Sequence, residues 1–384
     1  MARIYLDARS ITDTPSGVGR YARQLIGALC AADTDHEFTV IRHRSNEIPL
    51  DIDATGSPST LREITVDRAI DGVDNFLFGH RTLEAAFARG GTPDLYHSLF
   101  HILPRNIRRA VGDAPVVTTL HDFVWLDHPD ASQPKWSTAR TIEAFARIAI
   151  PTALRASDRV IAISEPTRRR ARDFVDDDRM VTISHGVDDV FFEPTEPPSG
   201  DFAELADGDK PTIVAIGNHK PYKNLGLLVD AFSKLIDGDL DARLVLIGDC
   251  EGLTDQIAAS PASEHVHLPG FVGDDLLRRL LGAARVFVFP SKVEGFGLPI
   301  LEAMATGTPT IVADLEPMRS IAQEAALLVD PDRPADLARL LRRIIEDDDL
   351  AETLGSRGRR RAGEFRWDET AQATLEVYGE LGLR

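Results

Sequence analysis

Short apolar runs alternate with segments of helical periodicity along nearly the whole chain of 384 residues. The runs at 212–216, 244–247 and 286–289 hold mainly Val, Ile, Leu and Phe and lack polar alternation, as buried parallel strands do. Residues 17–29 instead repeat their apolar side chains along one helical stripe. Because strand and helix patterns follow one another in this order, the sequence predicts a doubly wound α/β architecture.

The runs expected to form strands fall into two groups. In the first half they lie at 4–6, 38–41, 95–97, 116–121, 160–164 and 181–183. In the second half they lie at 212–216, 244–247, 266–268, 286–289, 310–312 and 327–329. Each group suffices for one Rossmann-like sheet, and the chain is longer than one hydrophobic core usually serves. We therefore expect two domains.

The alternation is interrupted at residues 193–210 by a set of helix- and strand-breaking residues, namely Pro194, Pro197, Pro198, Gly200 and Gly208. We interpret this segment as an interdomain linker. It separates a domain at 1–192, expected to bind the acceptor, from a domain at 208–365, expected to bind a nucleotide sugar. These two Rossmann-like domains would face a central cleft. The last helix, within 366–384, has no strand after it and can pack on either domain.

Composition excludes some classes of partner and compartment. The formal net charge of -18 argues against a nucleic-acid-binding protein, because phosphate contacts require surplus Lys and Arg. The two cysteines, Cys30 and Cys250, offer no disulfide framework, which favours a reducing cytoplasm. The N-terminus reads as a strand rather than a signal peptide, and no apolar run is long enough to span a membrane. Any membrane contact is expected to be peripheral.

One constellation after the run at 286–289 suggests chemistry. Gly295 and Gly297 permit close approach of a ligand, and Pro299 suits the first turn of a helix that starts near Leu298. The free N–H groups at that helix start suit a diphosphate. Two carboxylates, Glu294 and Glu302, flank this turn and can accept hydrogen bonds from sugar hydroxyls. The alternative is that Glu294 is an ordinary loop acid and that Glu302 is only a first-turn partner of the helix dipole.

Residues after other runs are further candidates. Lys220 and Lys223 follow the run at 212–216, and the alternative is that both are ordinary surface lysines. His121 ends the run at 116–121, where the carboxyl end of a parallel strand commonly carries site residues. Gly17 begins a Gly-x-Gly turn that serves either phosphate approach or helix packing, and it is a weak signal alone.

Taken together, the motifs resemble a known family. Glu294 and Glu302 match the E-x7-E motif of the retaining glycosyltransferases of family 4, which have the GT-B fold. Further matches lie in the segments starting at Ser16, Tyr96, His121, Ile163, His185, Lys220 and Phe365. The resemblance covers nearly the whole chain and is closest to mannosyltransferase-like members. Two positions depart from the family pattern, because Tyr222 stands where Arg is usual and Asn218 where some members carry Arg.

The resemblance implies a retaining transfer of a hexose, with mannose favoured, from a nucleoside-diphosphate sugar to a glycan or lipid-linked acceptor. GDP-mannose is the favoured donor, and no metal or other cofactor is expected. His121, Lys223 and Glu294 are implied as catalytic residues. Donor contacts are implied or expected at Gly17, Asn218, Lys220, Lys223, Gly295, Phe296, Gly297, Leu298 and Glu302. The alternatives are a sugar-nucleotide epimerase or hydrolase on the same fold, and a non-catalytic nucleotide-sugar-binding protein.

The acceptor pocket would be lined by side chains that follow strands of the first domain, namely His97, His101, Trp125 and His128. The alternative is that these side chains only pack the loops. The histidines lack the spacing of metal ligands, so we expect no metal site. The basic run Arg168–Arg170 is read as a solvated helix face. Its alternative is attraction to anionic lipid at the inner face of the membrane, where each basic residue contributes ~1 kcal/mol.

Overall fold

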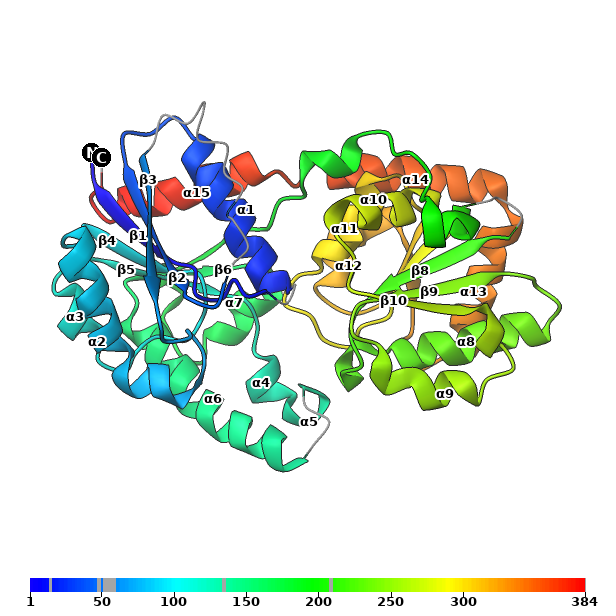
Figure 1. The fold of residues 1–384 in the computed structure, drawn as a ribbon, viewed down its shortest axis with the longest axis horizontal. Coiled ribbons are helices and arrows are strands. Elements are labelled where there is room, and N and C mark those ends of the chain that lie inside the picture. Colours follow the sequence, from blue (N-terminus) through cyan, green and yellow to red (C-terminus); the bar gives the residue numbers. More distant parts are fainter. Residues whose placement is uncertain (14–15, 47–49, 51–59, 133–135, 207–209, 384) are drawn as a thin grey trace. The chain divides into compact units, whose positions relative to one another are not determined.

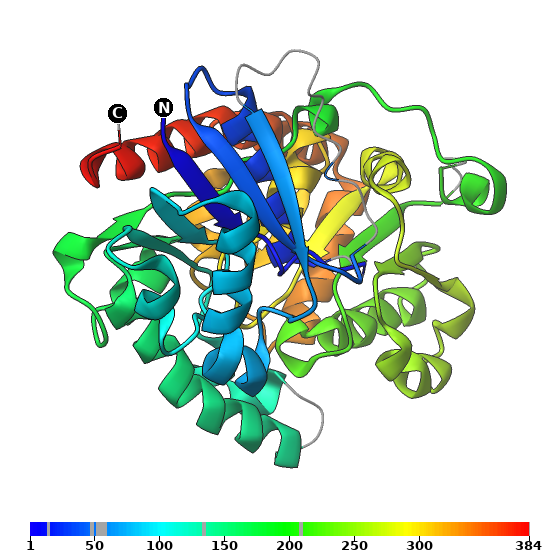
Figure 2. The same ribbon diagram turned by 60° about the vertical axis from the view of Figure 1, so that its left-hand side comes forward.

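The computed structural model describes residues 1–13, 16–46, 50, 60–132, 136–206 and 210–383. The chain divides into two compact units (Figures 1 and 2). The first consists of Met1–Pro129, Trp136–Gly186 and Arg366–Arg384, and the second of Asp130–Lys135 and Val187–Phe365. Each unit holds one parallel sheet with helices on both faces, which confirms the predicted α/β fold class.

The first sheet has the strand order β3-β2-β1-β4-β5-β6-β7. The strands are β1 (Arg3–Asp7), β2 (Glu37–His43), β3 (Thr60–Val66), β4 (Leu95–Ser98), β5 (Val116–Leu120), β6 (Arg159–Ala162) and β7 (Met180–Thr182). The longer helices are α1 (Gly17–Ala31), α2 (Gly72–Gly90), α6 (Trp136–Ala156), α7 (Glu165–Ala171) and α15 (Trp367–Glu380). Shorter ones are α3 (Ile107–Val111), α4 (Val124–Asp127) and α5 (Pro129–Ser132).

Strand β3 is the described strand of this sheet that the sequence pattern did not predict. It pairs only with β2 and forms the edge of the sheet. Its polar residues Arg62, Glu63 and Thr65 are exposed, so the strand carries no continuous apolar run. A half-exposed edge strand of this kind has a weaker hydrophobic signal than a strand covered on both faces.

The second sheet has the strand order β10-β9-β8-β11-β12-β13. The strands are β8 (Thr212–Ile216), β9 (Arg243–Ile247), β10 (Val266–Gly270), β11 (Val286–Phe289), β12 (Thr310–Ala313) and β13 (Leu327–Val329). The helices are α8 (Leu225–Asp237), α9 (Thr254–Ala258), α10 (Asp274–Ala283), α11 (Leu298–Ala305), α12 (Met318–Ala322), α13 (Pro334–Glu346) and α14 (Asp348–Ala362). Every strand run expected here is present. Between β8 and β11 the strand order reverses, which is where ligands of such sheets bind.

The chain passes from the first unit to the second at Gly186, ahead of the segment 193–210 that we interpreted as the linker. Residues 207–209 of that segment lie outside the described part of the chain. The C-terminal helix α15 belongs to the first unit and packs on α1, with Trp367 and Tyr378 buried (Figure 1).

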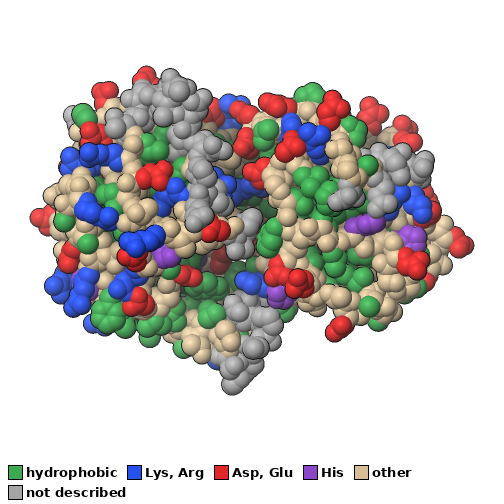
Figure 3. All heavy atoms as spheres, viewed as in Figure 1, with side chains coloured by type: hydrophobic (Ala, Val, Ile, Leu, Met, Phe, Trp, Pro, Cys, Tyr) green, Lys and Arg blue, Asp and Glu red, His purple; other side chains and the backbone are tan. Residues whose placement is uncertain are grey.

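Acidic side chains are spread over the visible face of both units rather than gathered in one patch (Figure 3). On this face the net negative charge is therefore a general surface property and does not mark one acidic site. In the described part of the chain, no helix has the length and apolar character needed to cross a bilayer.

Gly186 is expected to be intolerant of any side chain. A Cβ atom there would collide with the backbone nitrogen of Trp367, where α15 begins. Gly186→Ala should therefore lower the free energy of unfolding by about 2 kcal/mol through overpacking. Gly27→Ala is the matched control, because apart from the adjoining backbone of α1 itself no atom lies within 4 Å of a Cβ built there. Denaturant unfolding of both variants checks this, and equal stabilities would contradict it.

Candidate active site

Two loops of the second unit meet at the carboxyl ends of the neighbouring strands β8 and β11. The backbone N–H of Lys292 donates to the carbonyl oxygen of Tyr222 at 2.8 Å. The side-chain amide of Asn224 donates to the carbonyl oxygen of Pro290 at 3.1 Å. These bonds fix the β8–α8 loop, which carries the lysines, against the β11–α11 loop, which carries Glu294.

The two loops bring a predicted cation and a predicted carboxylate into contact. Lys223 Nζ lies 2.7 Å from Glu294 Oε1. The side chains are only 16% and 13% exposed, so the pair is better shielded from water than a surface ion pair. The geometry therefore brings together two of the residues expected to be catalytic, although they are far apart in the sequence.

The turn before α11 has the backbone geometry expected for close approach of a ligand. Gly297 has φ +137°, which side chains rarely permit, and its Cβ would lie 2.9 Å from Ile300 Cδ1. Pro299 stands in the first turn of α11, and Gly307 follows the helix with φ +81°. The predicted short helix from Leu298 is thus confirmed, and the N–H groups of its first turn lie next to the Glu294 loop.

The other predicted donor residues of this region are placed differently. Glu302 is 3% exposed and lies beyond the first turn of α11, so it is not a first-turn partner of the helix dipole. The side chain of Phe296 is 5% exposed and packs edge-on against Phe365, with ring centroids 6.1 Å apart. Since Leu298 is buried as well, Phe296 and Leu298 can offer a ligand their backbone but little side-chain surface.

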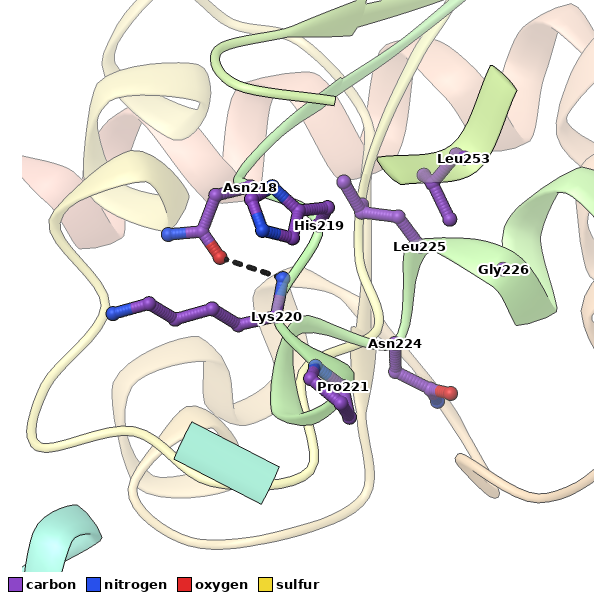
Figure 4. Close-up of a pocket in the computed structure, with 8 residues that line it drawn as sticks. All are labelled: Asn218, His219, Lys220, Pro221, Asn224, Leu225, Gly226 and Leu253. Atoms are coloured by element: carbon purple, nitrogen blue, oxygen red, sulfur yellow. Dashed lines mark hydrogen bonds between the residues drawn. The ribbon is translucent and has the colours of Figure 1, made fainter. Parts of the chain in front are cut away.

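Asn218 and Lys220 line a cavity of about 200 Å³ at the carboxyl end of β8, together with His219, Pro221, Asn224, Leu225, Gly226 and Leu253. The backbone N–H of Lys220 donates to Asn218 Oδ1 at 3.1 Å. Figure 4 shows the side chains of Asn218 and Lys220 extending to the same side of the loop, away from Leu253. His219 was not predicted, and its Nδ1 lies 3.2 Å from Asp249 Oδ2.

Three glycines at the carboxyl ends of adjacent strands were also missed. Gly217 follows β8, Gly248 follows β9, and Gly270 ends β10. Gly248 has φ +111°, and a Cβ there would collide with the carbonyl oxygen of Gly217. These three neighbouring strands therefore carry no side chain at the position where each ends or is left by the chain. The available signal was a glycine after each of three apolar runs.

In the first unit, His121 follows β5 and is buried, with Nε2 2.9 Å from the carbonyl oxygen of Leu99. Burial lowers the pKa of His121 to about 4, so the imidazole is neutral at pH 7. Its ring meets Tyr21 edge-on at 5.0 Å. Gly17 lies at the first position of α1 rather than in the preceding turn, and Ser16 caps that helix by accepting from the N–H of Gly19 at 3.0 Å.

The four side chains expected at the acceptor have unlike surroundings. His97 is fully buried, with Nδ1 2.6 Å from Tyr378 Oη and Nε2 2.9 Å from Thr119 Oγ1. Both of its nitrogens are therefore engaged inside the unit, which fits the packing role and not acceptor contact. His101 is also buried, but no described atom bonds its Nδ1. Trp125 is half-buried and His128 is exposed.

The buried histidines predict acid sensitivity. Burial lowers the pKa of His97 and of His101 to about 3, against about 6.5 in an unfolded chain. Between those values the unfolded chain binds more protons, so the free energy of unfolding falls as the pH drops below about 6.5, by up to ~1.4 kcal/mol per pH unit for each histidine. Denaturant unfolding at pH 7.5, 6.0 and 5.0 measures this slope. His101→Phe should make it shallower and His128→Gln should not, and identical slopes would refute the assignment.

Neither a metal site nor a free basic patch emerges from the described residues. They contain no group of three or more His, Cys, Asp or Glu side chains arranged to hold a metal ion. In the basic run of α7, Arg168 pairs with Asp177 and Arg170 with Asp127, and Arg172, just after the helix, also pairs with Asp177. These ion pairs neutralise much of the run and favour its reading as a solvated helix face.

Two family profiles match most of the chain. Residues 15–191 match the Glycosyltransferase Family 4 profile, and residues 200–361 match the Glycosyl transferases group 1 profile. The chain is 25% identical to the O-antigen chain mannosyltransferase B of Escherichia coli over 381 residues, which cover 94% of this chain and 96% of that protein.

Two solved structures share the fold over 99% of this chain. Sucrose-phosphate synthase from Thermosynechococcus elongatus is covered to 99%, with a TM-score of 0.77 and 22% identity. The Anabaena protein HepE in complex with UDP-glucose is covered to 100%, with a TM-score of 0.74 and 17% identity. By both profiles and its strand order, the chain is a glycosyltransferase of the GT-B fold, matching Family 4 in its first half and group 1 in its second.

Proposed function

We propose that the chain moves a hexose, with mannose favoured, from a nucleoside-diphosphate sugar to a hydroxyl of a glycan or lipid-linked acceptor, with retention of the anomeric configuration. The observation that carries this proposal is the Lys223–Glu294 pair beside the first turn of α11. A diphosphate at this turn meets backbone N–H groups and a lysine ammonium, while sugar hydroxyls meet a carboxylate.

The proposed chemistry consists mainly of electrostatic stabilisation. Negative charge develops on the diphosphate as the bond to the sugar breaks, and Lys223 with the α11 N–H groups would stabilise it. Lys220 would add a second positive charge, so that this loop supplies what a metal ion supplies elsewhere. Glu294 would orient the hexose and Glu302 the ribose. His121, neutral because its pKa is about 4, would serve as an uncharged hydrogen-bonding partner of a sugar hydroxyl.

Mannose is favoured by the similarity to an O-antigen chain mannosyltransferase, which also favours a glycan acceptor. The similarity in fold to a protein solved with UDP-glucose is the reason to include UDP-sugars among the donors tested. With a lipid-linked glycan as acceptor, the reaction would take place in the cytoplasm at the inner face of a membrane. The ion-paired arginines of α7 give no support to that helix as the contact.

The test is a screen of the purified protein against GDP- and UDP-sugars, with release of nucleotide and the anomeric configuration of the product as readouts. We expect acceptor-dependent release from GDP-mannose and a product with the configuration of the donor. Glu302→Ala should lose this turnover. Release of free sugar or of an epimer without acceptor would favour the hydrolase or epimerase alternative. Tight donor binding without turnover by any acceptor would favour a binding protein.

A further inference from the structure

The ammonium group of Lys223 is surrounded by more than its ion-pair partner. Lys223 Nζ lies 5.2 Å from the ring centroid of Tyr222 and 5.4 Å from that of Phe289. Both distances are within the range at which an aromatic face attracts a cation. We call Tyr222, Phe289 and Glu294 the Lys223 cage. It is formed entirely by the β8–α8 loop, the end of β11 and the β11–α11 loop.

The cage is held by the backbone rather than by the lysine alone. The carbonyl oxygen of Tyr222 accepts from the N–H of Lys292 at 2.8 Å, which ties Tyr222 to the β11–α11 loop. Phe289 is the last residue of β11, is buried, and stacks with Phe287 at 6.2 Å between centroids. The backbone of Tyr222 and the side chain of Phe289 are therefore held by contacts that do not involve Lys223.

Tyr222 stands at the position where the resemblance leads us to expect Arg, so the loop has one cation fewer. The ring changes what the remaining cation can do. A lysine ammonium on four freely rotating bonds loses substantial conformational entropy when it is fixed on a ligand. A ring that already orients it reduces this loss. An Arg at position 222 would repel Lys223 and compete for Glu294, whereas a neutral ring does neither.

Building on the proposed function, we propose that Tyr222 is a positioning residue that holds the Lys223 ammonium in place for the donor diphosphate, with Phe289 as the second wall. The aromatic rings carry no charge and so do not compete with Lys223 for the phosphate oxygens. In this chain, orientation of Lys223 takes the place of the cation that an Arg at position 222 would supply. Glu294 is then shared between holding Lys223 and receiving the sugar hydroxyls.

The test is a double-mutant cycle of Tyr222→Leu and Lys223→Met, with kcat for transfer and Kd for GDP and UDP as readouts. Tyr222→Leu alone should lower kcat or raise the nucleotide Kd about tenfold. Tyr222→Phe, which keeps the ring, should retain at least about half of the wild-type values. In the Lys223→Met background, Tyr222→Leu should have no further effect, because the cation that it positions is gone.

Equal losses from Tyr222→Leu in both backgrounds would overturn the proposal, since they would show a structural role. Wild-type values for Tyr222→Leu alone would overturn it as well. If that variant fails to fold, as judged by thermal unfolding, Phe289→Leu takes its place in the cycle. A wild-type protein that binds GDP or UDP but turns over no nucleotide sugar would refute the proposed function. The double-mutant cycle measured by nucleotide Kd would then still decide the role of Tyr222. Failure to bind either nucleotide would refute both.

Discussion

Replacing Lys223 by Met is expected to lower kcat for sugar transfer by about a thousandfold, the upper end of the loss seen when one preorganised charge-stabilising group is removed. The reason is that Lys223 meets Glu294 at the end of β11, where the diphosphate of the donor is proposed to lie. The missing ammonium would leave the charge developing on the leaving group to Lys220 and the backbone N–H groups. The fall should appear mainly in kcat, because the interaction strengthens as the charge develops.

Lys234→Met is the matched control. Lys234 is an exposed residue in the last turn of α8 and belongs to the same unit. The Lys234→Met variant has the same net charge as the Lys223 variant, and we expect it to keep wild-type kinetics. The comparison separates the local effect of Lys223 from a general loss of positive charge. A Lys223→Met enzyme within about threefold of the wild-type kcat would exclude Lys223 from leaving-group stabilisation.

The sequence predicted those parts of the site whose residues lie close together in the chain. Glu294, Gly297 and Pro299 lie within one short segment, so their spacing alone identified a turn, a helix start and a carboxylate. The contact between Lys223 and Glu294 depends on β8 and β11 being neighbours in the sheet, and that pairing joins residues far apart in the chain. Strand order is a property of the packed sheet, and no local pattern encodes it.

Burial separated residues that the sequence treated alike. His97 lies near the end of β4, His101 follows that strand, and His128 follows the short helix α4, and each was a candidate for acceptor contact. The structure places His97 between Tyr378 and Thr119, whereas His128 is exposed. The partner Tyr378 comes from the C-terminal helix α15, whose place in the first unit the sequence left open. A histidine's role could not be assigned before the docking of that helix was known.

A second interaction invisible to the sequence lies at the end of β1. Asp7 and Arg9 form an ion pair with Nη2–Oδ2 at 2.6 Å and Nε–Oδ1 at 2.8 Å, and both side chains are fully buried. Tyr96 on the neighbouring strand β4 donates its hydroxyl to Asp7 Oδ2 at 2.5 Å. Arg9 Nη1 also lies 3.1 Å from Asn75 Oδ1 at the start of α2 and 3.1 Å from the carbonyl oxygen of Arg68. Arg9 thus joins β1, β4 and α2.

We expect Arg9→Met to lower the free energy of unfolding by about 3 to 5 kcal/mol, because it leaves the buried carboxylate of Asp7 without its cation. Removing both charges should cost less than removing one. In Asp7→Asn/Arg9→Met no ionised group remains to be desolvated, and the amide can still accept from the hydroxyl of Tyr96. Denaturant unfolding of the two single variants and the double variant gives the coupling energy directly.

The matched control is Arg44→Met, because Arg44 pairs with Asp67 at 2.7 Å but both side chains are about 70% exposed. An exposed pair of this kind contributes at most about 1 kcal/mol, so the same change of residue should have little effect there. If Arg9→Met cost no more than Arg44→Met, burial would not be what makes the Asp7–Arg9 pair important. If the double variant were less stable than either single variant, the loss would come from packing around Arg9, and the pair would not act as one electrostatic element.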